Sequence, residues 1–168
     1  QGYEGATPTT LKLLRHWADP HRENRVMFCQ REAAETAIFI AEIAGRQAAS
    51  ADWRIRVDDA NAEHNHGMPR LAFKMATGSG KTVVMAMLIA WNTLNKVARP
   101  SDKRFAKRFL VVTPGITIRD RLRVLDPSEP GNYYHVRDLV PAELKAGLGQ
   151  AQILITNYLA FNMKDAKE

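Results

Sequence analysis

The sequence predicts an α/β protein with a mostly parallel sheet, and three observations lead to this expectation. Short apolar runs at 109–113 and 153–156 are typical of buried strands, and segments with helical apolar spacing separate them. A glycine-rich turn at 75–82 lies between a further apolar run and a long helical pattern. Ligands of parallel sheets bind beyond the carboxyl ends of the strands, so we expect the functional residues to gather there.

Length, charge and cysteine content limit the classes of protein to which this chain can belong. A chain of 168 residues is long enough for one domain with a real core, and its net charge of +6 favours a polyanionic partner, nucleic acid first. The single cysteine, Cys29, excludes an internal disulfide and fits a reducing cytoplasm. We find no signal peptide and no apolar run of about 18 residues, so we expect no membrane span. The chain opens without methionine and stops just after a strand-like segment, as a piece of a longer protein would.

The N-terminal third divides into an extension, a helix and an insertion. Residues 1–26 form the predicted extension, with one short helix near 11–17, and residues 28–44 carry alanine and isoleucine at helical spacing. Gln30 falls in the first turn of that helix. Residues 46–69 turn polar and are predicted to be a surface insertion. Its His64 and His66 lack neighbouring cysteines or further histidines, so we expect solvated side chains and no metal site.

The turn Met75-Ala76-Thr77-Gly78-Ser79-Gly80-Lys81-Thr82 has the composition of a phosphate-binding loop. We expect residues 70–75 to form the strand that leads into it. Gly78 and Gly80 permit backbone angles and a close approach that a side chain would block, and the N–H groups of the turn would face the phosphates. Lys81 would reach the β- and γ-phosphates, and the Thr82 hydroxyl would hold Mg²⁺. Methionine replaces the glycine of the general pattern at the first position. The alternative is a chance glycine turn with a solvated lysine.

The remaining elements follow in order. Residues 83–97 are apolar almost all round, which predicts a helix covered on most sides and ended by Pro100. A basic run at 103–108 is either a phosphate patch or a solvated start to the strand 109–113. That strand breaks at Pro114-Gly115, and a basic segment follows at 117–123. We expect a strand at 133–140, a short helix at 142–148 opened by Pro141, and a last buried strand at 153–156.

Four stretches, in the same order, resemble the motifs of superfamily-two helicase motors. Met-Ala-Thr-Gly-Ser-Gly-Lys-Thr resembles motif I of the motors of restriction enzymes, in which methionine is common at the first place. The stretch 28–33, Phe-Cys-Gln-Arg-Glu-Ala, is similar to the glutamine element upstream of motif I. Residues 111–122 resemble motif Ia, and residues 155–161 resemble the strand end before motif II. Together they resemble the R (restriction) subunit of type III restriction enzymes over most of 23–161.

The resemblance implies a three-layer α/β/α RecA-like P-loop NTPase domain over residues 27–168. Such a motor uses ATP and Mg²⁺ to move on double-stranded DNA, alongside a second RecA-like domain, often a nuclease, and a methyltransferase partner that carries specificity. Gln30 would read the adenine edge, since its amide offers a donor and an acceptor, and Arg25 would help to hold the nucleotide. A further set would track the DNA backbone: Thr113, Pro114, Gly115, Arg119, Thr156 and Asn157. For Thr113 and Thr156 alone, strand-end capping is the competing explanation.

One departure from the family pattern concerns catalysis. No acidic motif II occurs before residue 168, and hydrolysis needs a carboxylate that holds the metal and organises water. We therefore expect this chain to bind ATP weakly without turning it over. Two other function classes stay open: a different P-loop protein, such as a small-molecule kinase or transport ATPase, and a nucleic-acid-binding module that no longer hydrolyses ATP. DNA-stimulated ATP hydrolysis by the complete protein would separate the motor from both.

Overall fold

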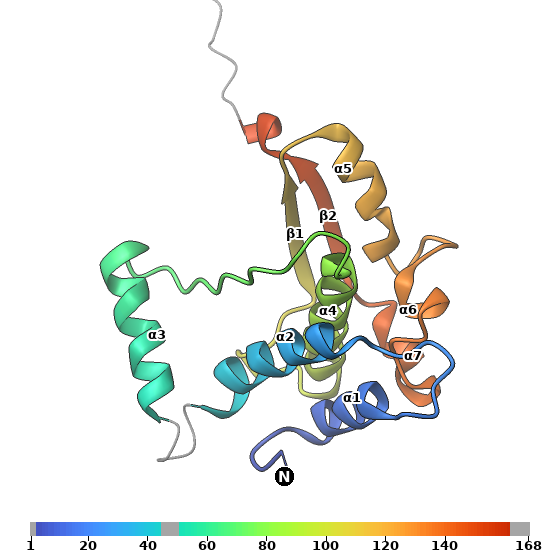
Figure 1. The fold of residues 1–168 in the computed structure, drawn as a ribbon, viewed down its shortest axis with the longest axis horizontal. Coiled ribbons are helices and arrows are strands. Elements are labelled where there is room, and N and C mark those ends of the chain that lie inside the picture. Colours follow the sequence, from blue (N-terminus) through green and yellow to red (C-terminus); the bar gives the residue numbers. More distant parts are fainter. Residues whose placement is uncertain (1–2, 45–50, 162–168) are drawn as a thin grey trace, which may run out of the picture.

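The computed structural model describes residues 3–44 and 51–161, and in this part the chain is mixed α/β and mostly helical (Figure 1). Its helices are α1 (Pro8–Ala18), α2 (Phe28–Ile38), α3 (Ala51–His64), α4 (Lys81–Ala98), α5 (Ile116–Arg121), α6 (Tyr133–Val136) and α7 (Lys145–Leu148). The strands β1 (Arg108–Thr113) and β2 (Gln152–Asn157) form one parallel sheet. A π-helical turn, η1 (Phe39–Ile43), extends α2, and shorter 3₁₀ turns are η3 (Leu122–Leu125), η4 (Ala142–Leu144) and η5 (Tyr158–Phe161).

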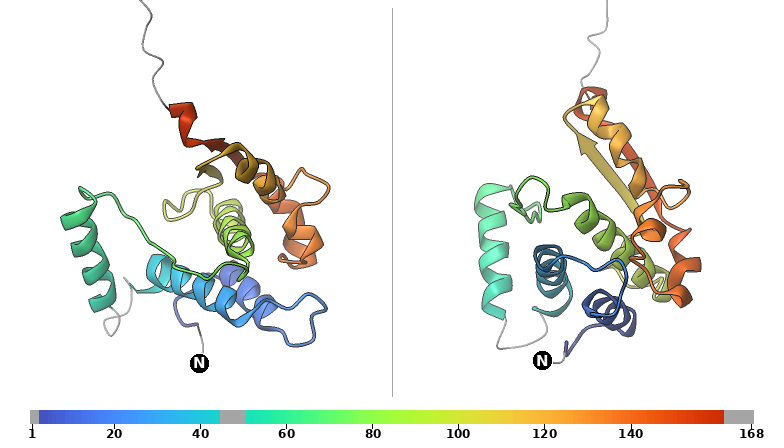
Figure 2. Two further views of the ribbon diagram at one scale, coloured as in Figure 1. Left: turned by 45° about the horizontal axis from the view of Figure 1, so that its top comes forward. Right: turned by 45° about the vertical axis from the view of Figure 1, so that its right-hand side comes forward.

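Helix α4 is the centre of the core. Met87 and Ala90 are fully buried within it, and Leu94 is almost so. In both views of Figure 2, α1 and α2 lie below α4, and the segment of α6 and α7 lies to its right. The helix ends at Ala98, with Arg99 as its C-cap, just before Pro100, which cannot continue it. The predicted helix at 83–97, covered on most sides, is therefore confirmed, as are the helices predicted at 11–17 and 28–44.

A buried polar network joins α1, η1 and α4. The Glu42 carboxylate, 2% exposed, accepts hydrogen bonds from Thr10 Oγ1 at 2.8 Å and from Trp91 Nε1 at 3.0 Å. Asn95 Nδ2 donates to the same Thr10 hydroxyl at 3.0 Å. A buried carboxylate is costly unless it is hydrogen-bonded, so these contacts fix the position of α1 against α4. The predicted extension 1–26 therefore contributes to the common core.

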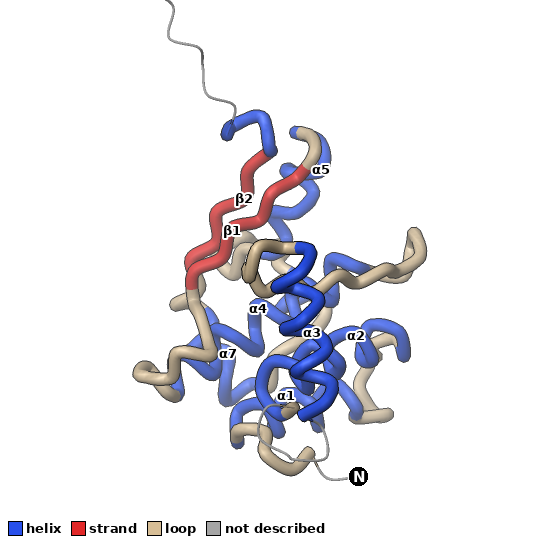
Figure 3. Tube along the Cα trace, turned by 90° about the vertical axis from the view of Figure 1, so that its left-hand side faces the viewer, coloured by secondary structure: helices blue, strands red, loops and turns tan. Residues whose placement is uncertain are grey.

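The sheet has one covered and one open face. Residue pairs run in parallel register from Arg108↔Gln152 to Thr113↔Asn157, and Figure 3 shows the two strands side by side. Val111 and Ile155 face the core, whereas Leu110 and Leu154 on the other face are 56% and 63% exposed. The strands at 109–113 and 153–156 are confirmed. The predicted three-layer arrangement is not confirmed, because within the described residues the apolar side chains of only one sheet face pack against the core.

Two segments predicted to be strands are not strands. Residues 70–75 run extended, with Leu71 41% and Phe73 37% exposed, and they pair with neither strand of the sheet. Residues 133–140 begin with α6 instead, because the Asn132 side chain accepts a hydrogen bond from His135 N at 2.9 Å and so caps a helical turn. The helix predicted at 142–148 forms as η4 and α7.

The predicted polar insertion contains a helix. Residues 51–64 form α3, which stands apart from the other helices in Figure 1, while 46–50 lie outside the described residues. His64 is the last residue of α3 and His66 follows two residues later, and the described residues hold no group of three or more metal-ligating side chains. No helix in the described ranges is long and apolar enough to cross a membrane.

Candidate nucleotide-binding site

The glycine turn has the backbone of a phosphate-binding loop. Gly78 and Gly80 have φ angles of 81° and 78°, in the left-handed region that favours glycine. Ser79 folds back on the turn, since its Oγ donates to Ala76 O at 2.7 Å. Helix α4 begins at Lys81, directly after the turn, and the first N–H groups of a helix have no intrahelical acceptor. The N-terminus of α4 and the turn therefore suit an anionic ligand, and the turn fits phosphates.

Lys81 lies across this turn. Its Nζ donates to Met75 O at 3.0 Å and to Ala76 O at 2.8 Å, so the ammonium is held over the loop by two backbone carbonyls. Phosphate oxygens carry more charge than these carbonyls and would compete with them for the ammonium. Thr82 follows at the second position of α4 and lines the adjacent pocket. A magnesium ion bound there would depend on this hydroxyl together with ligand phosphates, as is usual for Mg²⁺.

Gln30 joins the glutamine element to the glycine turn. The side chain is 5% exposed; its Oε1 accepts from Met27 N at 3.0 Å, and its Nε2 donates to Ser79 O at 3.0 Å. A primary amide has two donors and two acceptor lone pairs, so one of each remains after these two bonds. Gln30 can therefore hold the turn and still offer the donor–acceptor pair that an adenine edge requires.

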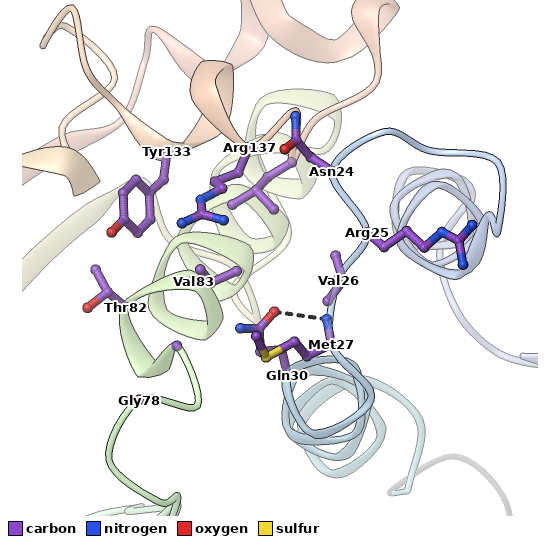
Figure 4. A pocket seen from close by; sticks show the side chains of 12 residues that line it. Asn24, Arg25, Val26, Met27, Gln30, Gly78, Thr82, Val83, Tyr133 and Arg137 are labelled. Atoms are coloured by element: carbon purple, nitrogen blue, oxygen red, sulfur yellow. Dashed lines mark hydrogen bonds between the residues drawn. The ribbon is translucent and has the colours of Figure 1, made fainter.

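The pocket at this junction is a cleft of about 180 Å³. It is lined by the segment before α2, the glycine turn with the start of α4, and the region of α6: Asn24, Arg25, Val26, Met27, Gln30, Gly78, Gly80, Thr82, Val83, Tyr133, Arg137 and Leu139. Enclosed ligand pockets measure roughly 300–1,000 Å³, so a nucleotide here would stay partly open to solvent. Arg25 belongs to the lining, but its side chain points away from the other labelled side chains in Figure 4.

Tyr133 and Arg137 were not among the predicted site residues, and residues 133–140 were expected to form a strand. Tyr133 is the first residue of α6 and Arg137 is its C-cap, so their four-residue spacing puts both side chains on one face of the turn, and both line the pocket. The next residue, Tyr134, points into the core and donates to Leu125 O at 2.7 Å, and burial raises the pKa of its hydroxyl. The capping residue Asn132 was the signal in the sequence that could have revealed this turn.

The strand ends bring a second set of predicted residues together. Thr113, 3% exposed, pairs in register with Asn157, and its Oγ1 donates to Gly115 O at 2.9 Å and lies 3.3 Å from Thr156 O. Asn157 Oδ1 accepts from Ala160 N at 3.1 Å. The hydroxyl of Thr113 is therefore committed to a strand-end cap, the competing explanation for that residue. None of these residues is among the described ones that line the pocket at the glycine turn.

Pro114 and Arg119 complete the strand-end set. Pro114 lies in the turn between β1 and α5, and Arg119 lies on α5, which packs along both strands. The Arg119 guanidinium is paired with its neighbour, since Nη2 lies 2.9 Å from Asp120 Oδ1. A DNA phosphate would have to compete with this exposed ion pair, which is a modest obstacle because such pairs contribute little free energy.

The fold and the turn define a mixed α/β domain with a phosphate-loop sequence at the start of the longest helix among the described residues. Residues 21–167 match the family model of the type III restriction enzyme, res subunit, and the chain belongs to that family. Membership of this family implies a RecA-like domain and places the chain in a family of helicase-type ATPases. Searches of curated proteins and of solved structures gave no significant match.

Proposed function

We propose that this chain is the ATP-binding RecA-like domain of a DNA translocase, the restriction subunit of a type III-like restriction endonuclease. The observation that carries the proposal is the hydrogen bond from Gln30 to Ser79 O, across 49 residues of sequence. It joins the two stretches that the family resemblance assigns to adenine and to phosphate. A chance glycine turn would have no reason to be held by a glutamine at this place.

The roles of the pocket residues follow from their chemistry. Thr77, Gly78 and Gly80 would present backbone N–H groups to the phosphates, and Ser79 would do so once its N–H leaves Ala76 O, to which it donates at 3.3 Å. Lys81 would neutralise the β- and γ-phosphates, and Thr82 would contribute to Mg²⁺ binding. Mg²⁺ supplies charge neutralisation at the phosphates when it is bound. Gln30 selects adenine. Arg25 supports the nucleotide only if its side chain turns from the direction that Figure 4 shows.

The strand-end residues would contact double-stranded DNA through its backbone. Thr113, Pro114, Gly115, Thr156 and Asn157 lie at the carboxyl ends of β1 and β2 or in the turn after β1, and Arg119 lies on α5. The Thr113 hydroxyl would act by holding Gly115 O in place. Backbone groups, hydroxyls and amides bind phosphate oxygens without reading bases, which suits a motor that moves along any sequence. The net charge of +6 supports the same partner. Sequence specificity would come from a methyltransferase subunit.

The test is ATP hydrolysis by the full-length protein with and without double-stranded DNA. We expect DNA to stimulate hydrolysis, and Lys81→Ala to abolish it because the main positive charge at the transferred phosphate is lost. Lys12→Ala removes the same charge from an exposed lysine of α1, outside the pocket, and serves as the matched control. Asn157→Ala should reduce the stimulation by DNA and leave basal hydrolysis unchanged. A rate of ATP hydrolysis that is unchanged by DNA, or unchanged in Lys81→Ala, contradicts the proposal.

A further inference from the structure

The nucleotide pocket has a wall with no assigned role. Tyr133, Arg137 and Leu139 line it together with the glycine turn and Gln30. Figure 4 shows the side chains of Tyr133 and Arg137 reaching into the space above Thr82 and Val83, at the start of α4. The lining residues include two arginines and no acidic residue. Because Arg25 points away, Arg137 is the lining cation whose side chain extends toward the pocket in that view.

The guanidinium of Arg137 is available for a ligand. It lies 5.6 Å from the centre of the Tyr133 ring, and the structure records no hydrogen bond or ion pair of this side chain with the described residues. The adjacent carboxylate is used elsewhere: Asp138 Oδ1 lies 3.2 Å from Lys145 Nζ, and its Oδ2 lies 3.5 Å from His16 Nε2. The tyrosine ring limits the directions that the guanidinium can take, since a cation is attracted to the face of an aromatic ring.

The backbone of this wall is held firmly from the N-terminal segment. Trp17 Nε1 donates to Leu139 O at 2.8 Å, and Arg22 Nη2 donates to Arg137 O at 3.1 Å and also to Asp138 O. His16 Nε2 lies 2.7 Å from the same Asp138 carbonyl. Three consecutive carbonyls are therefore fixed by side chains of residues 16–22. Arg22 is 8% exposed, and burial lowers the pKa of its guanidinium, so this anchor is internal.

A fixed backbone that carries an unpaired arginine over a phosphate-binding turn suggests a binding role. We propose that Arg137 binds phosphate oxygens of the nucleotide, and that Tyr133 positions its guanidinium. A guanidinium is planar, stays charged and matches phosphate oxygens with two parallel N–H donors. The site would thus hold the triphosphate between Lys81 on one side and Arg137 on the other. This inference rests on the proposed function, because it requires a nucleotide in this pocket.

The experiment measures nucleotide affinity of the full-length protein by displacement of a fluorescent ATP analogue with ATP and with adenosine. Four variants are compared with the native protein: Arg137→Ala, Arg137→Lys, Lys81→Ala and Arg99→Ala. Arg99 follows the far end of the 18-residue helix α4, about 27 Å from the turn, so its removal controls for the loss of one positive charge. Circular dichroism of each variant establishes that it is folded.

We expect Arg137→Ala to weaken ATP binding about tenfold, which corresponds to about 1.4 kcal/mol, and to leave adenosine binding unchanged. Arg137→Lys should recover part of the loss, since it keeps the charge and loses the paired donors. If Arg137→Ala binds ATP as tightly as Arg99→Ala does, the inference is overturned. An equal loss of adenosine affinity in Arg137→Ala would also overturn it, because the contact would then be on the base or sugar.

The failure of this inference can be told apart from a failure of the proposed function. Binding that is lost in Lys81→Ala and unchanged in Arg137→Ala overturns the role of Arg137 and leaves the ATP site as proposed. Binding that is weakened by Arg137→Ala and indifferent to Lys81→Ala supports Arg137 and contradicts the assignment of the glycine turn.

Discussion

Residues 70–75 and strand β2 are both short apolar runs before a functional turn, yet only β2 is a strand. Strand β2 pairs with β1 along its whole length and places Ile155 against the core. Residues 70–75 have no such partner within the described residues, and Leu71 and Phe73 stay exposed. An extended run becomes a strand only when a neighbour takes its backbone N–H and C=O groups. The comparison shows that the glycine turn is held here by side chains and not by a sheet.

Hydrogen bonds from the side chains of Gln30 and Lys81 fix the backbone of this turn, as pairing with a neighbouring strand would otherwise do. Gln30 holds Ser79 O, and Lys81 holds the carbonyls of Met75 and Ala76. The turn is therefore sensitive to changes at those side chains and at the glycines they pack against, whereas β1 and β2 depend on the burial of their inner face.

Among the variants that test this comparison, the largest effect is expected from Gly80→Ala. A Cβ at Gly80 would lie 2.1 Å from Gln30 Nε2, and its φ of 78° disfavours any side chain, so the amide must leave Ser79. We expect ATP affinity to fall about thirtyfold, or about 2 kcal/mol, measured by calorimetric titration. Gly78→Ala is the matched control, because its φ is 81° and a Cβ there meets nothing within 4 Å. Equal losses for both variants would show that strain alone, and not contact with Gln30, governs the turn.

An effect of similar size, on stability and not on binding, is expected from replacing an apolar residue of the paired region, and a small one from the unpaired region. Val111→Ser in β1 removes buried apolar surface and adds a hydroxyl to the core, so the free energy of unfolding should fall by about 2 kcal/mol. Leu71→Ser changes a side chain that is 41% exposed in the unpaired segment, and should cost less than about 0.5 kcal/mol. Denaturant unfolding of both variants provides the measurement. A cost for Leu71→Ser as large as that for Val111→Ser would mean that residues 70–75 are packed in solution.

The smallest effect is expected from removing the hydrogen bond of Trp17 to Leu139 O, which holds the pocket wall after α6. Trp17→Phe keeps most of the buried ring and removes the donor to Leu139 O, which should lower the free energy of unfolding by about 1 kcal/mol. Trp53→Phe, at a tryptophan that is 61% exposed, is the control and should leave stability unchanged within about 0.5 kcal/mol. Thermal unfolding distinguishes the two. An unchanged midpoint for Trp17→Phe would show that this hydrogen bond does not anchor the wall.

The sequence predicted the elements whose apolar pattern is satisfied inside this chain. Helix α4, with Met87 and Leu94 on a covered surface, and the strands around Val111 and Ile155 are examples. The strand at 70–75 was wrong because pairing depends on a neighbour, which a local pattern does not contain. The helix α3 was missed because its segment is largely polar and its large apolar residues, Trp53, Ile55 and Val57, alternate and do not follow helical spacing, although alanine and arginine favour helices.

The candidate site was predictable only where a local sequence pattern marks it. The glycine turn and Gln30 stand out in the sequence, and the structure brings them within a hydrogen bond of each other. Tyr133 and Arg137 could not be found from the sequence. A strand would also have put residues four apart on one face, but no local pattern shows that this face lies against the glycine turn. The hydrogen bonds that hold this wall come from Trp17 and Arg22, more than a hundred residues earlier in the chain, and no local pattern reveals such contacts.

The most direct test of the nucleotide site is competition of a fluorescent ATP analogue by ATP and by GTP, on the native chain, Lys81→Ala and Gln30→Ala. The account predicts that ATP competes better than GTP, that Lys81→Ala abolishes binding, and that Gln30→Ala removes the preference for ATP and weakens binding, because the turn loses its support at Ser79. Equal competition by ATP and GTP on the native chain, with no change in Gln30→Ala, would contradict the account.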